Sequence, residues 1–170
     1  MATRTQQILD ACQPFRIRSE TVVLATIIET MGSTYQKAGA RMLITASGEC
    51  HGMLGGGCFE DDLKEKAGAV FRDGQAKLVF YDMRSPADAI WGLGMGCNGA
   101  LRILLQSLSG QDNYRPLSFI EDSLRREKSG VLVTVYESTD PEWQAGTVFL
   151  LDGDLVKNAG TDCPTVPATI

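Results

Sequence analysis

The sequence predicts a single α/β domain in which helices pack on a mixed β-sheet. Its 170 residues are 44% hydrophobic and 22% charged, which is the usage of one ordinary globular domain. Residues Thr21–Thr30 form a β-branched, nearly all-apolar run, the pattern of a strand buried on both faces. Residues Phe59–Phe71 instead place apolar side chains at helical spacing. Strand-like and helix-like segments alternate in this way along the chain.

The first third of the chain predicts one helix followed by three strands. A helix is expected over Thr5–Cys12, and Pro14 is expected to end it because proline cannot donate the next helical hydrogen bond. The buried strand Thr21–Thr30 follows. A second strand is expected over Arg41–Thr45 and a short returning strand over Cys50–Leu54.

The second part of the chain repeats this alternation. Asp73-Gly74 is expected to close the Phe59–Phe71 helix, since glycine readily adopts the left-handed conformation that ends helices. Ser85-Pro86 begins a short helical turn that runs to Ile90. The remaining elements are strands over Lys77–Tyr81, Ala100–Leu108, Val131–Glu137 and Thr147–Leu151, and a helix over Pro116–Glu127. The buried runs Val22–Ile28, Leu78–Phe80 and Leu101–Leu105 are expected to hold the domain together.

Two pairs of segments resemble each other. Val23–Thr30 is similar to Val131–Ser138, and Ala38–Ile44 is similar to Ala145–Leu151. The match indicates an internal repeat, although two β-rich runs can also match by chance. Only the first copy continues into Gly-Gly-Gly-Cys, so that copy would carry function and the second would be scaffold.

Composition limits the function classes. The formal net charge of −5 argues against nucleic acid, which needs a basic surface. The apolar runs are too short to span a bilayer, and the first residues have no apolar signal core, so a cytoplasmic protein is expected. Thiols stay reduced there, so five cysteines are not read as disulfides, and a single histidine without paired CxxC spacing disfavours structural zinc. Residues 1–160 are expected to form the domain and residues 161–170 a linker or tail.

The first candidate site is the glycine turn Gly55, Gly56 and Gly57, which runs into Cys58 and then into the predicted helix. Glycine lets the backbone approach a ligand closely, and a helix N-terminus attracts anions and lowers the pKa of a thiol placed there. The turn therefore offers an anion site and a candidate thiolate. The alternative is a tight strand-to-helix turn with a buried, inert cysteine.

A second glycine cluster contains Gly94, Gly96, Cys97 and Gly99. It satisfies the G-x-G-x-x-G pattern, but no clear strand precedes it and a strand-like run follows, so a dinucleotide site fits poorly. A backbone turn that presents Cys97 fits better, and a buried tight turn is the alternative. If the two loops meet, Cys58 and Cys97 would suit a soft metal or a sulfur-bearing ligand.

Arg41 is a further candidate. It stands with Lys37 on either side of Gly39, where a guanidinium could hold a phosphate with two hydrogen bonds. Ordinary solvated charge is the alternative. Neither cysteine loop has a histidine nearby in the sequence, so no catalytic residue is assigned.

Four motifs, taken in order, resemble the N-terminal domain of the XdhC/CoxI family, the accessory factors of xanthine dehydrogenase and related molybdenum hydroxylases. They are Gly32-Ser33, Gly39–Met42, Gly56–Glu60 and Trp91–Gly99. One departure is Tyr35–Ala38, where such proteins often have Pro-Arg-Arg-Pro. Larger members carry a C-terminal Rossmann domain, toward which the tail would lead.

The resemblance implies a non-catalytic chaperone that binds the molybdenum cofactor, a molybdopterin, and assists its sulfuration and insertion. The implied partners are a molybdenum hydroxylase of the xanthine dehydrogenase type and a cysteine desulfurase, while homo-oligomerisation is left open. Cofactor contacts would come from Gly55–Gly57, Cys58, Gly94, Gly96, Cys97 and Gly99, with Arg41 as an electrostatic candidate. Two alternatives remain: a thiol-dependent redox or transferase enzyme that uses Cys58, and a non-catalytic interaction domain.

Overall fold

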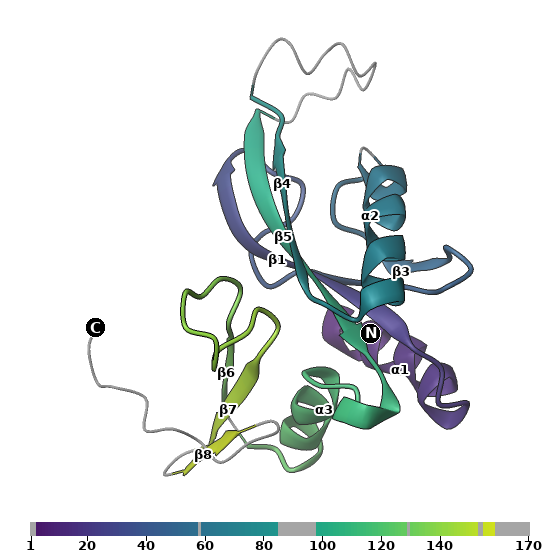
Figure 1. Cartoon of the computed structure of the whole chain (residues 1–170), viewed down its shortest axis with the longest axis vertical. Helices are drawn as coiled ribbons and strands as arrows, with labels where there is room; N and C mark the ends of the chain where they lie inside the picture. The colour runs from purple at the N-terminus through teal and green to yellow at the C-terminus, as the bar shows by residue number, and fades with distance from the viewer. Residues whose placement is uncertain (1–2, 58, 85–97, 129, 153–154, 159–170) are drawn as a thin grey trace.

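Two antiparallel sheets and three α-helices make up the fold, seen in a computed structural model that describes residues 3–57, 59–84, 98–128, 130–152 and 155–158 (Figure 1). The helices are α1 (Arg4–Ile17), α2 (Glu60–Asp73) and α3 (Leu117–Arg125). The larger sheet has the order β3-β2-β1-β5-β4, with bounds Cys50–Gly52, Arg41–Ile44, Val22–Gly32, Gly99–Leu108 and Lys77–Asp82. The smaller sheet has the order β6-β7-β8, with bounds Val131–Thr134, Val148–Asp152 and Leu155–Asn158.

The predicted single-domain α/β class is confirmed, but every described strand pair is antiparallel, where a mixed sheet was expected. Strands β3 and β4 run in the same direction, and α2 connects them as a crossover. They lie at opposite edges of the sheet, however, because β2, β1 and β5 stand between them. The crossover therefore creates no parallel pair.

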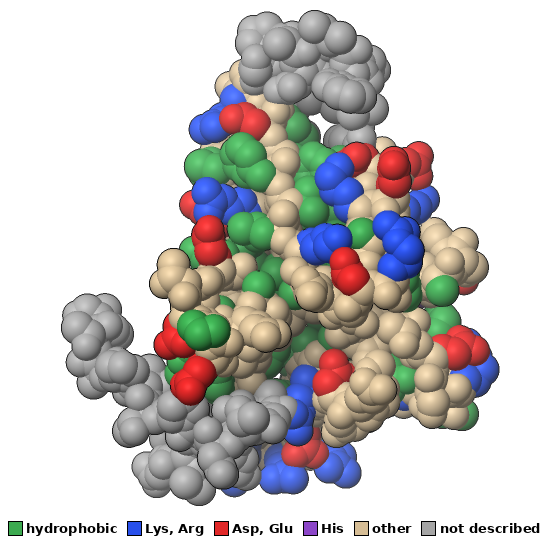
Figure 2. All heavy atoms as spheres, viewed as in Figure 1, with side chains coloured by type: hydrophobic (Ala, Val, Ile, Leu, Met, Phe, Trp, Pro, Cys, Tyr) green, Lys and Arg blue, Asp and Glu red, His purple; other side chains and the backbone are tan. Residues whose placement is uncertain are grey.

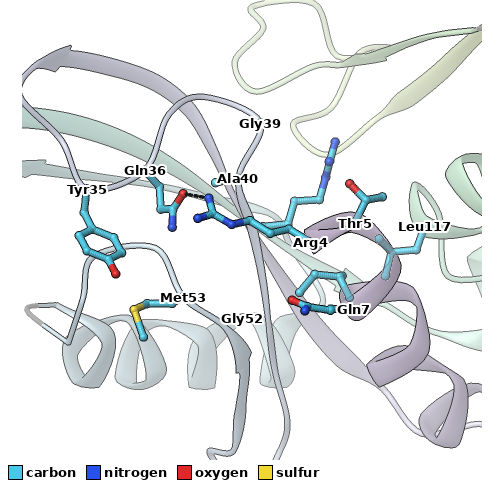
Figure 3. A pocket seen from close by; sticks show the side chains of 12 residues that line it. Arg4, Thr5, Gln7, Tyr35, Gln36, Gly39, Ala40, Gly52, Met53 and Leu117 are labelled. Atoms are coloured by element: carbon cyan, nitrogen blue, oxygen red, sulfur yellow. Dashed lines mark hydrogen bonds between the residues drawn. The ribbon is translucent and has the colours of Figure 1, made fainter. Parts of the chain in front are cut away.

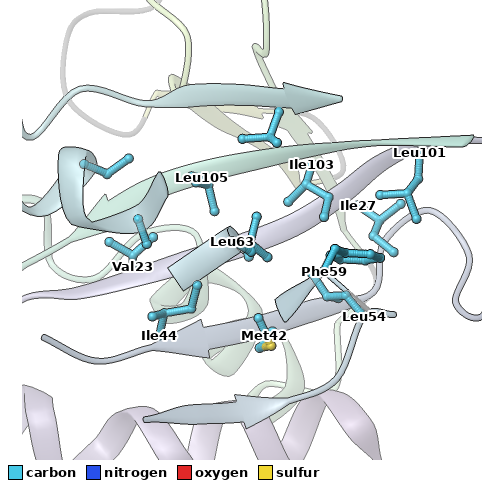
Figure 4. Close-up of a cluster of buried hydrophobic side chains, with 14 residues drawn as sticks. Val23, Ile27, Met42, Ile44, Leu54, Phe59, Leu63, Leu101, Ile103 and Leu105 are labelled. Atoms are coloured by element: carbon cyan, nitrogen blue, oxygen red, sulfur yellow. The ribbon is translucent and has the colours of Figure 1, made fainter. Parts of the chain in front are cut away.

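Alternating side chains of β1 supply both faces of the sheet. Val23, Ala25 and Ile27 point into a core shared with α2, which contributes Leu63, Ala67 and Val70 (Figure 4). Val22 and Leu24 pack on the other face against α1 and α3. The strand is thus buried on both sides, as its continuous apolar run predicts.

Helix α1 extends beyond its predicted end. It runs to Ile17 with Pro14 inside it, so the expectation that Pro14 ends the helix is wrong. Proline costs the helix one hydrogen bond, but tertiary contacts hold the last turn. Glu121 of α3 accepts hydrogen bonds from Gln13 and Arg16, and the buried Tyr114 hydroxyl donates to the Phe15 carbonyl at 3.2 Å.

Helix α2 matches its prediction at both ends within a residue or two, and Gly74 closes it at φ +71°. On its outer side, Lys64 pairs with Asp61 and Lys66 with Asp62, so acidic and basic side chains are interspersed on this face (Figure 2). Such exposed pairs contribute little to stability. The helix is held by its buried face.

The smaller sheet repeats the geometry of β1–β2–β3. In the first copy, Gly39 (φ +90°) donates to the Ile27 carbonyl at 2.8 Å, and Ile27 donates to the Ala40 carbonyl at 2.9 Å. In the second, Gly146 (φ +93°) donates to the Val135 carbonyl at 2.8 Å and Val135 to the Thr147 carbonyl at 2.8 Å. These positions correspond in the sequence match, so the structure supports the internal repeat.

One expected part of the core is exposed. Of Leu78, Val79 and Phe80 on β4, only Val79 is buried, while 37% of Leu78 and 50% of Phe80 remain exposed. Strand β4 is an edge strand, and only one of its faces is covered by α2. The predicted turn Ser85–Ile90 and the tail 161–170 lie outside the described residues.

Candidate functional site

The glycine turn lies between β3 and α2 and needs its glycines for different reasons. Gly56 and Gly57 adopt positive φ of +69° and +100°, which other residues rarely adopt. A Cβ on Gly55 would lie only 2.2 Å from the Phe59 ring, so that ring occupies the space of a side chain. Phe59 in turn stacks on Tyr81 with ring centroids 4.6 Å apart. The turn is therefore a packed structure.

The backbone N–H groups of this turn converge on the carboxylate of Glu60, the first residue of α2. Its Oε1 accepts from Gly55 at 2.7 Å and from Leu54 at 3.3 Å. Its Oε2 accepts from Gly57 at 3.0 Å and from Phe59 at 3.3 Å. The anion site predicted at this helix N-terminus thus holds a carboxylate of the chain itself, and an external anion would compete with Glu60 there.

Several predicted cofactor contacts cannot be placed. Cys58, Gly94, Gly96 and Cys97 lie outside the described residues, so the proposed pairing of the two thiols stays a prediction. Within the described residues, no group of three His, Cys, Asp or Glu side chains could hold a metal ion.

The end of the second glycine cluster is described and lies against β1. Gly99 pairs with Gly32, and a Cβ on Gly99 would lie 2.2 Å from the carbonyl oxygen of Ser33. A Cβ on Gly32, which has φ +71°, would lie 2.6 Å from the carbonyl oxygen of Asn98. The family motif Gly32-Ser33 therefore permits a close backbone approach to Asn98-Gly99.

One short loop joins the two glycine segments. Ser33 donates its N–H to the Asn98 carbonyl at 3.1 Å. Two residues later, the Tyr35 ring lies over Gly56, with ring atoms 3.5 Å from where a Cβ would stand. Two extended residues span only about 7 Å. Asn98, just after Cys97, and Gly56, just before Cys58, therefore both contact the short loop 33–35.

Arg41, at the start of β2, lies beside Gly52, at the end of the strand that leads into the first glycine turn. A Cβ on Gly52 would be 2.9 Å from the Arg41 carbonyl oxygen, and Gly52 pairs with the next residue, Met42. Burial lowers the pKa of the Arg41 guanidinium. Its Nε is buried without a hydrogen-bond partner, and Arg41 forms no ion pair with any described residue. Such a cation is poorly solvated and favours an anionic partner.

A pocket of about 400 Å³ opens beside Arg41 (Figure 3). The N-terminal turns of α1, the loop 35–40, the ends of β2 and β3, and Leu117 of α3 surround it. Arg4 of α1 donates a hydrogen bond across the loop to the buried side chain of Gln36. Sequence reasoning missed Arg4 and Gln36, which are 32 residues apart, and no local motif marks them.

The described cysteines outside the glycine loops are not activated thiols. Burial raises the pKa of Cys12 to about 11 and also raises the pKa of Cys50. Thiols with raised pKa values are poor nucleophiles at neutral pH. Neither Cys12 nor Cys50 is therefore a candidate nucleophile. The third such cysteine, Cys163, lies outside the described residues.

The antiparallel sheet, its helices and the glycine segments at one end define a small α/β domain built around glycine loops. Residues 16–82 match the model of the XdhC and CoxI family, and this stretch of the chain is similar to that family. The predicted family resemblance is thereby confirmed. No helix among the described residues has both the length and the apolar character needed to cross a membrane.

Two relatives extend the comparison. The chain is 38% identical over 120 residues to a Bacillus subtilis (strain 168) protein whose name describes a probable subunit of xanthine dehydrogenase, covering 71% of this chain and 36% of that protein. It also superposes, with a TM-score of 0.73 and 31% identity, on a crystal structure from Bacillus halodurans described as a xanthine dehydrogenase. That match covers 91% of this chain and 45% of the other. The chain thus spans less than half the length of either relative.

Proposed function

We propose that this chain is an accessory factor of a xanthine dehydrogenase-type molybdenum hydroxylase. In this role it binds the molybdenum cofactor as cargo and assists its sulfuration and insertion into the hydroxylase. The observation that carries the proposal is the family match over residues 16–82, together with relatives whose names refer to xanthine dehydrogenase. The role is one of binding and delivery, with no catalytic residue assigned.

The described residues fit such cargo in two respects. The two glycine segments start from one region, joined through Ser33 and Tyr35, which supports a single site for Cys58 and Cys97. The orphaned Nε of Arg41 and the adjoining pocket offer an anion partner beside the first turn. The bound cofactor would supply a soft metal centre for the thiols and a phosphate for the guanidinium groups.

Sulfuration needs a sulfur donor, so a cysteine desulfurase is the second proposed partner. The chain would hold the cofactor while its oxo ligand is exchanged for a sulfido ligand and then pass it to the apo-hydroxylase. We place both partners and the chain in the cytoplasm.

Reconstitution of an apo-hydroxylase tests this function. The purified apo-enzyme is mixed with cofactor and a cysteine desulfurase system, with and without the chain, and xanthine oxidation is measured. The proposal predicts faster or more complete activation when the chain is present. Equal activation with and without the chain, or with bovine serum albumin in its place, would contradict an accessory role.

The alternative of a thiol-dependent enzyme receives less support. Glu60 holds its carboxylate against the N–H groups of Gly57 and Phe59, the residues on either side of Cys58. These N–H groups already bond the Glu60 carboxylate, so the helix-terminal donors that would activate a nucleophilic thiol are occupied. Turnover of a small thiol-reactive substrate that is lost in Cys58→Ser would favour the enzyme instead.

A further inference from the structure

The pocket between α1 and the loop 35–40 carries positive charge on an acidic protein. Its described lining residues include two arginines, Arg4 and Arg41, and no aspartate or glutamate. The whole chain has 21 acidic and 16 basic residues, so a pocket whose charged lining residues are both basic differs from the chain as a whole. We call it the Arg4–Arg41 pocket.

Neither arginine is neutralised by the described part of the chain. No ion pair of Arg4 or Arg41 occurs among the described residues, as is also true of Arg72 and Arg115, whereas the other six described arginines are paired with carboxylates. Arg4 is held toward the pocket by its hydrogen bond to Gln36, whose position is fixed in turn by the Thr34 hydroxyl donating to the Gln36 carbonyl at 2.8 Å. The buried Nε of Arg41 has no hydrogen-bond partner in the part of the chain that the structure describes. Two guanidinium groups are therefore available in one cavity.

The start of helix α1 adds to this field. The 14-residue helix begins at Arg4, and both Arg4 and Thr5 line the pocket. Its first turn contains no acidic residue, unlike the first turn of α2, where Glu60 occupies the turn. Thr3 caps this end by accepting the Gln6 N–H at 3.2 Å, and the positive end of the helix dipole still favours an anion nearby.

We propose that the Arg4–Arg41 pocket binds the phosphate group of a phosphomonoester ligand. Guanidinium groups match phosphate oxygens with paired hydrogen bonds, and two of them suit the double charge of a monoester. A volume of about 400 Å³ lies in the range of small-molecule sites and exceeds the needs of a bare ion. Ile8, Met53 and Leu117 provide an apolar wall for an organic part.

This inference rests on the proposed function only in assigning a place to the terminal phosphate of the cofactor. The pocket borders the glycine turn through Gly52 and Met53, and Tyr35 contacts both the pocket and Gly56. A ligand with its phosphate in the pocket could therefore extend toward the turn. The charge argument itself holds for any phosphomonoester.

Titration with inorganic phosphate tests the pocket without any cofactor. Binding is measured by isothermal titration calorimetry in low-salt, phosphate-free buffer for the wild type, Arg4→Gln and Arg41→Gln. The matched control is Lys37→Gln, which removes an exposed cation from the same loop outside the pocket. Each arginine variant is expected to weaken phosphate binding about tenfold and the lysine variant less than about threefold. Only the arginine variants remove charge-assisted hydrogen bonds made directly to the phosphate.

The outcomes of this titration decide the inference. No phosphate binding by the wild type overturns it, and so does equal weakening in Lys37→Gln, which would show diffuse attraction only. If Arg41→Gln unfolds, as circular dichroism would reveal, the exposed Arg4→Gln still gives the answer. Phosphate binding without molybdenum cofactor binding upholds the pocket and contradicts the proposed function, while cofactor binding without phosphate binding does the reverse.

A second titration separates free phosphate from a phosphomonoester. Guanosine 5′-monophosphate serves as a bulky monoester and is compared with inorganic phosphate on the same variants. Tighter binding of the nucleotide, again lost in Arg4→Gln, supports a ligand with an organic part. Binding of inorganic phosphate alone would contradict the phosphomonoester assignment.

Discussion

Replacing Glu60 by alanine should destabilise the domain by disordering the glycine turn. The Glu60 carboxylate accepts four backbone hydrogen bonds, of which those from Gly55 at 2.7 Å and Gly57 at 3.0 Å are the shorter. A hydrogen bond to a charged group contributes about 1.5–3 kcal/mol. Gly57 is exposed, so water would partly replace its bond. We therefore expect a loss of about 2–3 kcal/mol in the free energy of unfolding, set by the two shorter bonds.

Urea denaturation followed by circular dichroism measures this loss. With an m-value of about 2 kcal/mol/M for a domain of this size, the midpoint should fall by roughly 1–1.5 M. Glu60→Gln should lose about half as much, since the amide keeps one acceptor oxygen but turns an NH₂ group toward backbone donors. The control is Glu65→Ala on the exposed side of the same helix, which should change stability by less than about 0.5 kcal/mol. Equal midpoints for Glu60→Ala and Glu65→Ala would refute the reasoning.

Three further predictions concern stability. Gly99→Ala should lower the free energy of unfolding by more than about 2 kcal/mol, because the added Cβ would overlap the Ser33 carbonyl. Gly110→Ala, where the added Cβ meets open space, should be near neutral, and equal denaturation midpoints for the two variants would contradict this. Burial raises the pKa of the Cys12 thiol from 9.0 to about 11, so the stability that this group contributes is complete below pH 9 and is lost as the pH rises toward 11, by about 1.4 kcal/mol per pH unit at most. Cys12→Ala should therefore make the urea midpoint fall less steeply with rising pH in this range, and an unchanged slope would count against the prediction. Tyr114→Phe should cost about 1–2 kcal/mol in the same assay, because the single hydrogen of the buried hydroxyl is shared between the Glu20 and Phe15 carbonyls, and a loss under a few tenths would be inconsistent with that role.

The sheet was predictable because its signals are local. The apolar run at Thr21–Thr30 marks a strand covered on both faces, and β1 is that strand. The exposure of Leu78 and Phe80 could not be foreseen, since an edge strand and a central strand can share the same short apolar pattern. Pro14 misled for a related reason, because contacts with α3 over 100 residues away hold the last turn of α1.

The residues of the candidate site also fall into those that local sequence reveals and those that only tertiary contacts reveal. The glycine turn and Arg41 were visible as composition and charge, and the structure places Arg41 beside Gly52, on the strand that leads into the turn. The role of Glu60 was missed because the usual capping box places glutamate at the third helical position, whereas Glu60 is the first residue of α2 and bonds the turn before it. Arg4 and Gln36 are distant in the sequence and meet only in the folded chain, so sequence motifs could not predict the pocket that they line.

The central claim, that this chain binds the molybdenum cofactor through its two glycine loops, is tested most directly by titrating the purified protein with that cofactor. Retained molybdenum and pterin fluorescence are measured after gel filtration for the wild type, Cys58→Ser and Cys97→Ser, with Cys50→Ser as the control. We predict that the wild type and Cys50→Ser retain the cofactor and that Cys58→Ser and Cys97→Ser release it. Failure of the wild type to retain the cofactor, or equal retention by all four proteins, would contradict the account.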